Sequence, residues 1–331
     1  MRSSILRRFP DGNWDVITSL SGEPLHRIHM VQVIGSEVIL IGEERVYRWH
    51  GIGGAWSVRV ADYTDYFQGR RLPVSASFTW ERSLNEFLSR RSPLDSRRDL
   101  LVFNRGYVEN PREASGVHIL SSSEVKKTFF LPQPTITDLK RHRPLIVKDY
   151  IRFWEGTGLG ALQNGIGPYV FDQGKLWFGI SFYGGEGWTG IGGVGSFDPN
   201  TGRWTIDYHP LLTRSSVTAL HSDGDVLWLG TLHSGERAST PSSGLVRYNR
   251  RTRRAVSYLP KNSNICSWWI TAVRRIGNEI WLGVGENGIS VLNLRSGAWS
   301  NYAVFPNSAP ASRIRSLASK CTGVRVAPQE N

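Results

Sequence analysis

A tryptophan that recurs about every 50 residues constrains the fold of this chain more than any other feature. Trp177, Trp228 and Trp281 each stand in a short segment of the form Leu/Ile-Trp-Phe/Leu-Gly. A glycine opens a second apolar segment after each of them, and a third segment that often contains Trp or Tyr follows. A repeat of about 50 residues with this pattern is typical of one four-stranded blade of a β-propeller.

Each repeat predicts four short strands, which we name A to D. Strand A is apolar and β-branched, strand B carries the tryptophan, strand C begins at the glycine, and strand D follows a hairpin turn. Gly, Asp and Asn at the turns tolerate the positive φ angles that tight hairpins need. The sequence therefore predicts an all-β fold with six four-stranded antiparallel blades, at 26–63, 74–131, 167–208, 215–259, 268–304, and at 4–20 together with 312–327.

The two ends of the sequence carry complementary halves of one blade. Residues 4–20 have the pattern of strands C and D, and residues 312–327 have the pattern of strands A and B. Pairing these halves would close a ring and leave no unpaired sheet edge. We therefore expect a single β-propeller domain that spans residues 1–331.

The stretch 132–166 leaves the number of blades open. Thr135–Leu139 resembles a strand A, and the segment from Leu145 to Trp154 could be a strand or a short helix. As a degenerate blade the stretch would make the total seven, and as an insertion it would leave six. We expect six blades.

The best-preserved repeat resembles a known family. Val217–Thr231, followed by Gly244-Leu-Val-Arg-Tyr248, resembles the two-component-regulator propeller repeat, and the resemblance is clearest over 170–304. It implies a propeller of the kind found as sensor regions of bacterial signalling proteins and as stand-alone modules. The chain lacks the kinase and transmembrane parts of the large sensors. A looser resemblance, to the streptogramin lyase propellers, rests on the Leu/Ile-Trp-Phe strand, and their catalytic His and Glu pattern is not found here.

Motifs for cofactors give no support for a bound cofactor or metal. Gly190–Gly195 matches the dinucleotide fingerprint in letters, but a strand and a hairpin turn are expected after it in place of the helix that binds the pyrophosphate. We find no phosphate-binding loop, nucleophile elbow or paired-histidine zinc motif. The 8 histidines lack metal-ligand spacing. We expect neither a cofactor nor a metal.

Blade topology separates two ends of the fold. The A–B and C–D turns lie at one end, which we call the turn end, and the B–C and D–A connections lie at the other, the loop end. The longest connections, at 104–115, 132–167, 181–193 and 232–243, fall at the loop end, where binding residues usually sit. Candidate ligand-binding residues there are Arg105, Tyr107, Tyr183, Glu186, Trp188, His233, Arg237, Trp268 and Trp269. Such side chains suit a sugar or a peptide; alternatively, the loops only pack on one another.

The turn end is predicted to be basic. Its candidate residues are Arg90, Arg91, Arg97, Arg98, Arg250, Arg251, Arg253, Arg254, Arg274 and Arg275. With a formal net charge of +12, the chain suits phosphates or an acidic protein partner, in a salt-dependent manner. Few aromatic residues lie among these arginines, so we do not expect base-specific reading. The alternative is a solvated face without a partner.

The compartment is predicted from the N-terminus and the cysteines. No apolar stretch follows the basic start of the chain, and no apolar run approaches the ~20 residues that span a bilayer. We expect a cytoplasmic protein without a transmembrane segment, or a periplasmic or secreted one if a leader has been removed. Cys266 is expected at the loop end and Cys321 in an A–B turn at the turn end, too far apart to bridge.

The function expected from these features is that of a monomeric, non-enzymatic binding or protein–protein interaction module. Its loop end would hold a polar ligand or peptide, and its turn end an acidic partner. An alternative is a lyase or hydrolase in which His233 is the general base and Glu186 or Glu236 its carboxylate partner. A further alternative is nonspecific binding of nucleic acid through the basic turn end.

Overall fold

The computed structural model contains two compact units, which we describe separately. The first comprises Met1–Pro93 with Val304–Arg315, and the second Leu94–Ala303 with Ser316–Asn331. The structure describes residues 5–8, 14–17, 19–20, 23–24, 28–34, 37–42, 45–49, 56–60, 99–104, 111–121, 124–144, 161–182, 184–185, 188–233, 242–285, 288–303 and 315–316.

The first unit contains one four-stranded antiparallel sheet and two strand pairs. The pairs are β1 (Ile5–Arg8) with β2 (Trp14–Ile17) and β3 (Ser19–Leu20) with β4 (Glu23–Pro24). The sheet consists of β5 (Ile28–Ile34), β6 (Glu37–Gly42), β7 (Arg45–Trp49) and β8 (Trp56–Val60), in that order. Leu40 and Tyr47, which face each other across β6 and β7, are both buried. These four strands fall within the blade predicted at 26–63.

Among its described strands, the second unit contains three sheets built on four consecutive antiparallel strands, one sheet of three, and the short parallel pair of β12 (Ala161–Leu162) and β15 (Trp188–Thr189). The last of the three larger sheets has β26 (Arg315–Ser316) as a fifth strand. The three-stranded sheet has β9 (Asp99–Asn104), β10 (Ser115–Ser121) and β11 (Glu124–Phe130), with the short 3-10 helix η1 (Pro111–Glu113) before β10. The next sheet has β13 (Gly165–Asp172), β14 (Lys175–Ser181), β16 (Val194–Asp198) and β17 (Arg203–Asp207). It is followed by the sheet of β18 (Ser215–Asp223), β19 (Val226–His233), β20 (Leu245–Asn249) and β21 (Ala255–Tyr258). The last sheet has β22 (Ile270–Ile276), β23 (Glu279–Val284), β24 (Gly288–Asn293) and β25 (Trp299–Ala303). The predicted all-β class with four-stranded antiparallel sheets is confirmed.

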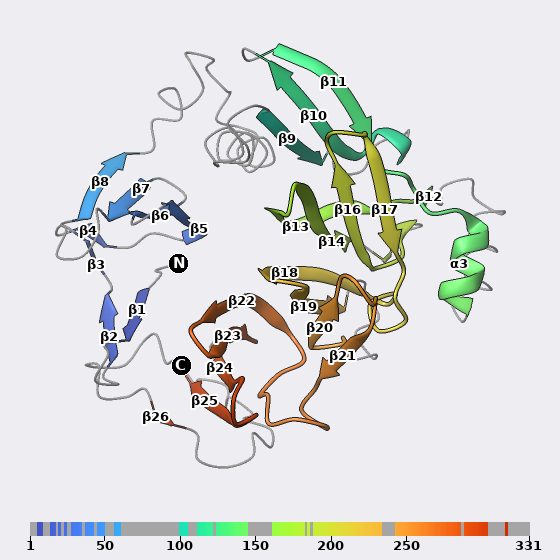
Figure 1. Cartoon of the computed structure of the whole chain (residues 1–331). Coiled ribbons are helices and arrows are strands. Elements are labelled where there is room, and N and C mark those ends of the chain that lie inside the picture. The colour runs from blue at the N-terminus through green and yellow to red at the C-terminus, as the bar shows by residue number, and fades with distance from the viewer. Residues whose placement is uncertain are drawn as a thin grey trace. The chain divides into compact units, whose positions relative to one another are not determined.

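Successive sheets of the second unit pack face to face (Figure 1). Strand β18 contacts β13 and β14, and β22 contacts β18 and β19. The glycines after Trp177 and Trp228 make this packing possible. A Cβ on Gly179 would overlap the side chain of Val217 in the next sheet, and one on Gly230 would lie 2.7 Å from Ile270 Cγ2. The repeated glycine is therefore needed because strand A of the following sheet approaches strand B closely at this point.

The insertion contains a helix where the sequence predicted a strand A. Helix α3 (Ile136–His142) begins at Thr135, whose side chain accepts a hydrogen bond from the backbone of Asp138, while Asp138 accepts one in return. This capping box outweighs the strand preference of the β-branched residues in Thr135-Ile-Thr, so the strand prediction for Thr135–Leu139 is wrong. The segment from Leu145 to Trp154 lies outside the described residues. The choice between six and seven blades stays a prediction.

The predicted closure of a ring by the two ends is not shown by the described residues. Strands β1 and β2 pair with each other, and the short C-terminal strand β26 (Arg315–Ser316) stands next to β25 in the sheet order. Cys266 is disulfide-bonded, which contradicts the prediction that the cysteines cannot bridge. The chain's one other cysteine, Cys321, lies outside the described residues. Placing Cys321 at the turn end, far from Cys266, depends on pairing 312–327 with the N-terminal strands, and the described residues do not show that pairing.

Candidate binding site at the loop end

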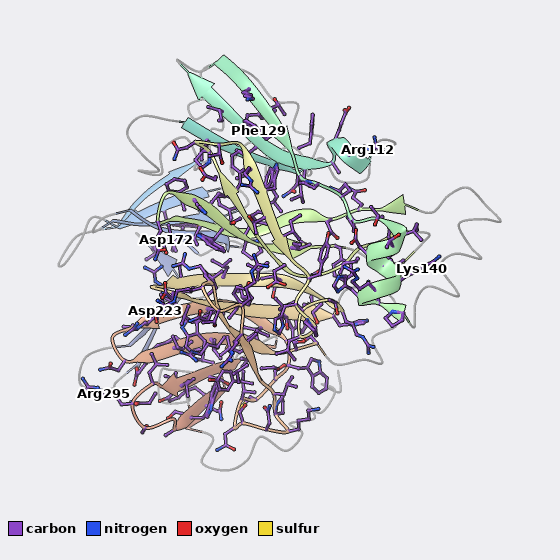
Figure 2. The ribbon with its side chains drawn as sticks, turned by 45° about the vertical axis from the view of Figure 1, so that its right-hand side comes forward. Arg112, Phe129, Lys140, Asp172, Asp223 and Arg295 are labelled. Carbon is purple, nitrogen blue, oxygen red and sulfur yellow. The ribbon has the colours of Figure 1, made fainter. Side chains whose placement is uncertain are left out.

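The second unit has the two distinct ends that its strand order predicts. Figure 2 shows Asp172, Asp223 and Arg295 on one side and Arg112 and Lys140 on the opposite side. Asp172 and Asp223 end strands β13 and β18 at A–B turns, and Arg295 lies in the C–D turn between β24 and β25. Arg112 and Lys140 belong to a B–C and a D–A connection, so the second group marks the loop end.

Side-chain amides bind the insertion to the loop that joins β14 and β16. Asn164 Nδ2 donates to the carbonyl of Ile191 at 3.0 Å, and the Ile191 amide donates to Asn164 Oδ1 at 2.9 Å. Gln133 bonds the backbone of Asn164 in the same reciprocal way, at 3.1 and 2.7 Å. Because Asn164 is fully buried, these bonds satisfy polar groups that would otherwise be costly to bury.

The same loop is also held by the connection that leads to the next sheet. The Phe182 amide donates to Ser216 Oγ at 2.9 Å, and that hydroxyl donates to the Phe182 carbonyl at 2.6 Å. Gly192 lies so close to this connection that a Cβ would overlap the carbonyl oxygens of Leu212 and Ser215. The glycines of Gly190–Gly195 thus serve close backbone packing, and they lead into strand β16, as predicted.

Arg143 is a buried cation that the sequence analysis missed. Its side chain follows α3, is 4% exposed, and donates from Nη1 to Thr189 Oγ1 at 3.0 Å and to the Gly190 carbonyl at 2.6 Å. Its guanidinium lies 5.1 Å from the ring centre of Phe182. Burial, with the charge of Arg214, lowers the pKa of Arg143 to about 10, so it is protonated at neutral pH. In sequence it belongs to a basic run at the end of a helix, a pattern usually found in solvent.

Trp268 presents an exposed ring on a fixed backbone. The side chain is 52% exposed, among the largest exposures of an apolar residue in the described part of the chain. Ser242 Oγ, from the loop between β19 and β20, donates to the Trp268 carbonyl, and Gly285, after β23, donates its amide to the carbonyl of Trp269 at 2.9 Å. Trp269 is partly buried. The predicted aromatic pair therefore lies at the loop end, held from two neighbouring sheets.

The other predicted ligand-binding residues are described only in part. His233 ends β19 opposite Ser215, and its Nδ1 atom is buried without a hydrogen bond to any described residue. Trp188 lies in β15 (Trp188–Thr189), which pairs in parallel with β12 (Ala161–Leu162). Outside the described residues lie Arg105, Tyr107, Tyr183, Glu186, Glu236 and Arg237. The acid–base pair of the enzyme hypothesis stays a prediction.

At the turn end, two of the predicted basic residues form ion pairs between sheets. Arg250 Nη2 lies 2.8 Å from Asp172 Oδ2, with its guanidinium 5.0 Å from the ring centre of Trp177, and only 4% of the Arg250 side chain is exposed. Arg275 pairs with Asp223 of the preceding sheet. The exposed members are Arg251, Arg253, Arg254 and Arg274, while Arg90, Arg91, Arg97 and Arg98 lie outside the described residues.

Comparisons with known proteins add no family or function. No protein-family model and no curated protein matches the chain. Among solved structures, it is similar to the extracellular domain of BT4673 from B. thetaiotaomicron, named as a one component system, at 13% identity and a TM-score of 0.37 over 87% of this chain and 31% of that chain. It is also similar to the computationally designed Ika8 protein, at 14% identity and a TM-score of 0.32 over 90% of this chain and 70% of that one. The chain thus spans less than a third of the BT4673 domain, and at these TM-scores neither likeness establishes a shared fold.

Within the described part of the chain, no helix is long and apolar enough to span a membrane. The same residues contain no group of three or more His, Cys, Asp or Glu side chains placed to hold a metal ion.

Proposed function

We propose that the chain is a non-enzymatic binding module that holds a polar small molecule or a peptide at its loop end. Its scaffold would be a single six-bladed propeller closed by the two chain ends. The four-stranded antiparallel sheets, which pack in sequence order in the second unit, support this scaffold, as does the resemblance to the two-component-regulator repeat. The proposal places the ligand where the connections between strands are long and held by side chains.

The exposed ring of Trp268 carries this proposal. A tryptophan presents a large apolar face with little conformational freedom to lose, and its N–H can bond a polar group. Hydrogen bonds from two neighbouring sheets already fix the backbone at Trp268 and Trp269. Binding there would therefore require little further ordering of the protein. Burying the exposed ring against the C–H groups of a sugar or a peptide side chain would be favourable.

A ligand screen with matched variants tests the proposed function. The thermal unfolding midpoint of the full chain is measured with free amino acids, dipeptides and neutral sugars. We expect one class to raise the midpoint and Trp268→Ala to weaken its affinity about tenfold, as for an aromatic anchor. Ile276→Ala is the control, because Ile276 is also exposed and ends strand β22, which begins two residues after Trp268. An equal loss of ligand affinity in Trp268→Ala and Ile276→Ala would contradict the proposal. So would a screen in which no ligand class raises the unfolding midpoint.

A second candidate function is binding of an acidic partner at the turn end. It is favoured by the C–D turn after β20, where Arg251, Arg253 and Arg254 are exposed and the side chain of Arg251 is 80% exposed. We expect Arg253→Ser with Arg254→Ser to elute earlier from heparin than the exposed loop-end pair Lys140→Ser with Arg141→Ser. Equal elution of the two double variants would count against a specific basic site.

We also propose that the protein works in an oxidising compartment, periplasmic or extracellular. Its support is the disulfide at Cys266, because disulfides persist where thiols are not kept reduced. Mass spectrometry of peptides from protein isolated from its native host, with free thiols blocked first, should find Cys266 in a disulfide. Complete alkylation of Cys266 without a reductant would overturn this proposal and favour the cytoplasm.

A further inference from the structure

The guanidinium of Arg143 is buried with one edge unused. A guanidinium has five N–H donors, and the Nε–H and Nη2 groups form an edge that matches the two oxygens of a carboxylate. Among the described residues, Arg143 uses Nη1 alone, for Thr189 and Gly190. Nε is buried and has no hydrogen-bond partner. The edge composed of Nε and Nη2 therefore makes no hydrogen bond to the described protein atoms.

The charge of Arg143 is not balanced by a described carboxylate. No described acid forms an ion pair with it, and the charge that acts on its ionisation is that of another cation, Arg214. A buried cation without a counter-charge is costly, so proteins normally pair it or bind an ion there. Its contact with the ring of Phe182 and its two bonds to the loop compensate only in part.

The groups around Arg143 are held in place by hydrogen bonds and close packing. Helix α3 places Arg143, the bonds between Asn164 and Ile191 hold the loop that contains Thr189 and Gly190, and Ser216 holds Phe182. A Cβ on Gly190 would overlap Asn164 and Phe182, so the loop backbone is packed against both. Each group around the guanidinium is thus fixed before any ligand arrives, which lowers the cost of binding.

We propose that Arg143, with Arg214 beside it, is a binding site for the carboxylate of a small organic acid. The carboxylate would accept two parallel hydrogen bonds, from Nε and Nη2, while the exposed Arg214 would attract the anion without forming the buried contact. A monoanion suits the site better than a phosphate dianion. Removing a second negative charge from water costs more free energy than one buried cation can offset. This site is separate from Trp268, and the inference goes beyond the proposed function.

The test measures stabilisation of the full chain by propionate. The thermal midpoint is followed against sodium propionate at constant ionic strength, with sodium chloride and sodium phosphate as comparison salts. We expect a saturating rise with propionate, by several degrees at concentrations far above the dissociation constant. Arg143→Lys keeps the charge but loses the two-donor edge, and it should weaken the apparent affinity about tenfold or more. Arg214→Gln should weaken it a fewfold.

Two controls and one direct signal keep the result decisive. Lys140→Gln, an exposed change on the same helix, and Trp268→Ala should leave the propionate response unchanged, so failure of the loop-end function and failure of this site can be told apart. In wild-type protein with ¹⁵N-labelled arginine, one Nε–H resonance should shift with the same dissociation constant. An equal response of Arg143→Lys and wild type, a larger response to phosphate, or no shifted Nε–H resonance would each overturn the proposal.

Discussion

At the scale of single residues, the contacts that join neighbouring sheets are polar as well as apolar. Asp172 receives hydrogen bonds from Ser222 Oγ and Arg250 Nη2, both from the following sheet. Arg250 stacks on Trp177 of the preceding sheet. Trp177 thus supports an interface between sheets. Removing Asp172 would leave the largely buried Arg250 without this counter-charge.

The Asp172–Arg250 pair should make stability depend on pH. Burial of Asp172 opposes its ionisation, but the hydrogen bonds from Ser222 and Arg250 and the charge of Arg250 lower the pKa of Asp172 below its usual value. Stability from this pair is therefore present above about pH 4, the pKa of an unfolded aspartate, and is lost as pH falls through the lowered folded-state pKa. We expect Asp172→Asn to cost about 2 kcal/mol at pH 7 and to show a flatter acid dependence.

Urea unfolding of both proteins between pH 7 and pH 2 measures this effect. Asp225→Asn is the control, because the Asp225 carboxylate lies 3.7 Å from the Nε of the largely exposed Arg251 and should contribute little. If Asp172→Asn and wild type lost stability in parallel on acidification, the account of this pair would be wrong.

Close backbone packing at Gly192 predicts a steep cost for one methyl group. In Gly192→Ala the new Cβ would overlap the Leu212 and Ser215 carbonyls, which belong to backbone and cannot rotate away. We expect a loss of about 2 kcal/mol or more in the free energy of unfolding. Gly165→Ala, where the nearest atom to a new Cβ is 3.4 Å away, should change it by less than about 0.5 kcal/mol. Similar losses in the two variants, measured by urea unfolding, would disprove the packing argument.

At the scale of elements, local repeats predicted the strands well and the insertion poorly. The Trp-x-Gly signature locates strands β14, β19 and β23. The glycines between strands mark the turns because tight turns require positive φ angles. In Thr135-Ile-Thr-Asp, strand propensity and a capping box compete, and the capping box prevails through Asp138. Burial of Arg143 depends on Thr189 and Gly190, more than 40 residues away, so no local pattern reveals it. The sequence places Trp268 at the loop end because Trp268 and Trp269 lie just before a strand A.

Helix α3 should depend on its capping box. Thr135→Ala removes the hydroxyl that accepts from the Asp138 amide at 3.1 Å and should cost about 1 kcal/mol of local stability. Hydrogen exchange of a peptide spanning 131–144 should accelerate accordingly. Lys140→Ala, an exposed change in the same helix, should leave exchange nearly unaltered. Equal exchange in Thr135→Ala and wild type would show that the cap does not stabilise the helix.

At the scale of the whole molecule, the second unit has a loop end, where we propose that a ligand binds, and a cationic turn end. The separation follows from the strand order of antiparallel sheets, and Figure 2 shows both ends of the second unit. Long connections held by Asn164, Ser216 and Ser242 supply the loop end. At the turn end, Arg250 and Arg275 join sheets, while Arg251, Arg253, Arg254 and Arg274 are exposed.

Hydrogen exchange of the full chain with and without a ligand from the screen tests the central claim most directly. We predict that a ligand slows exchange in the peptide covering 262–269 and leaves exchange in 249–255 and 294–298 unchanged. Slower exchange confined to 249–255 and 294–298 would place the ligand at the turn end and contradict the account.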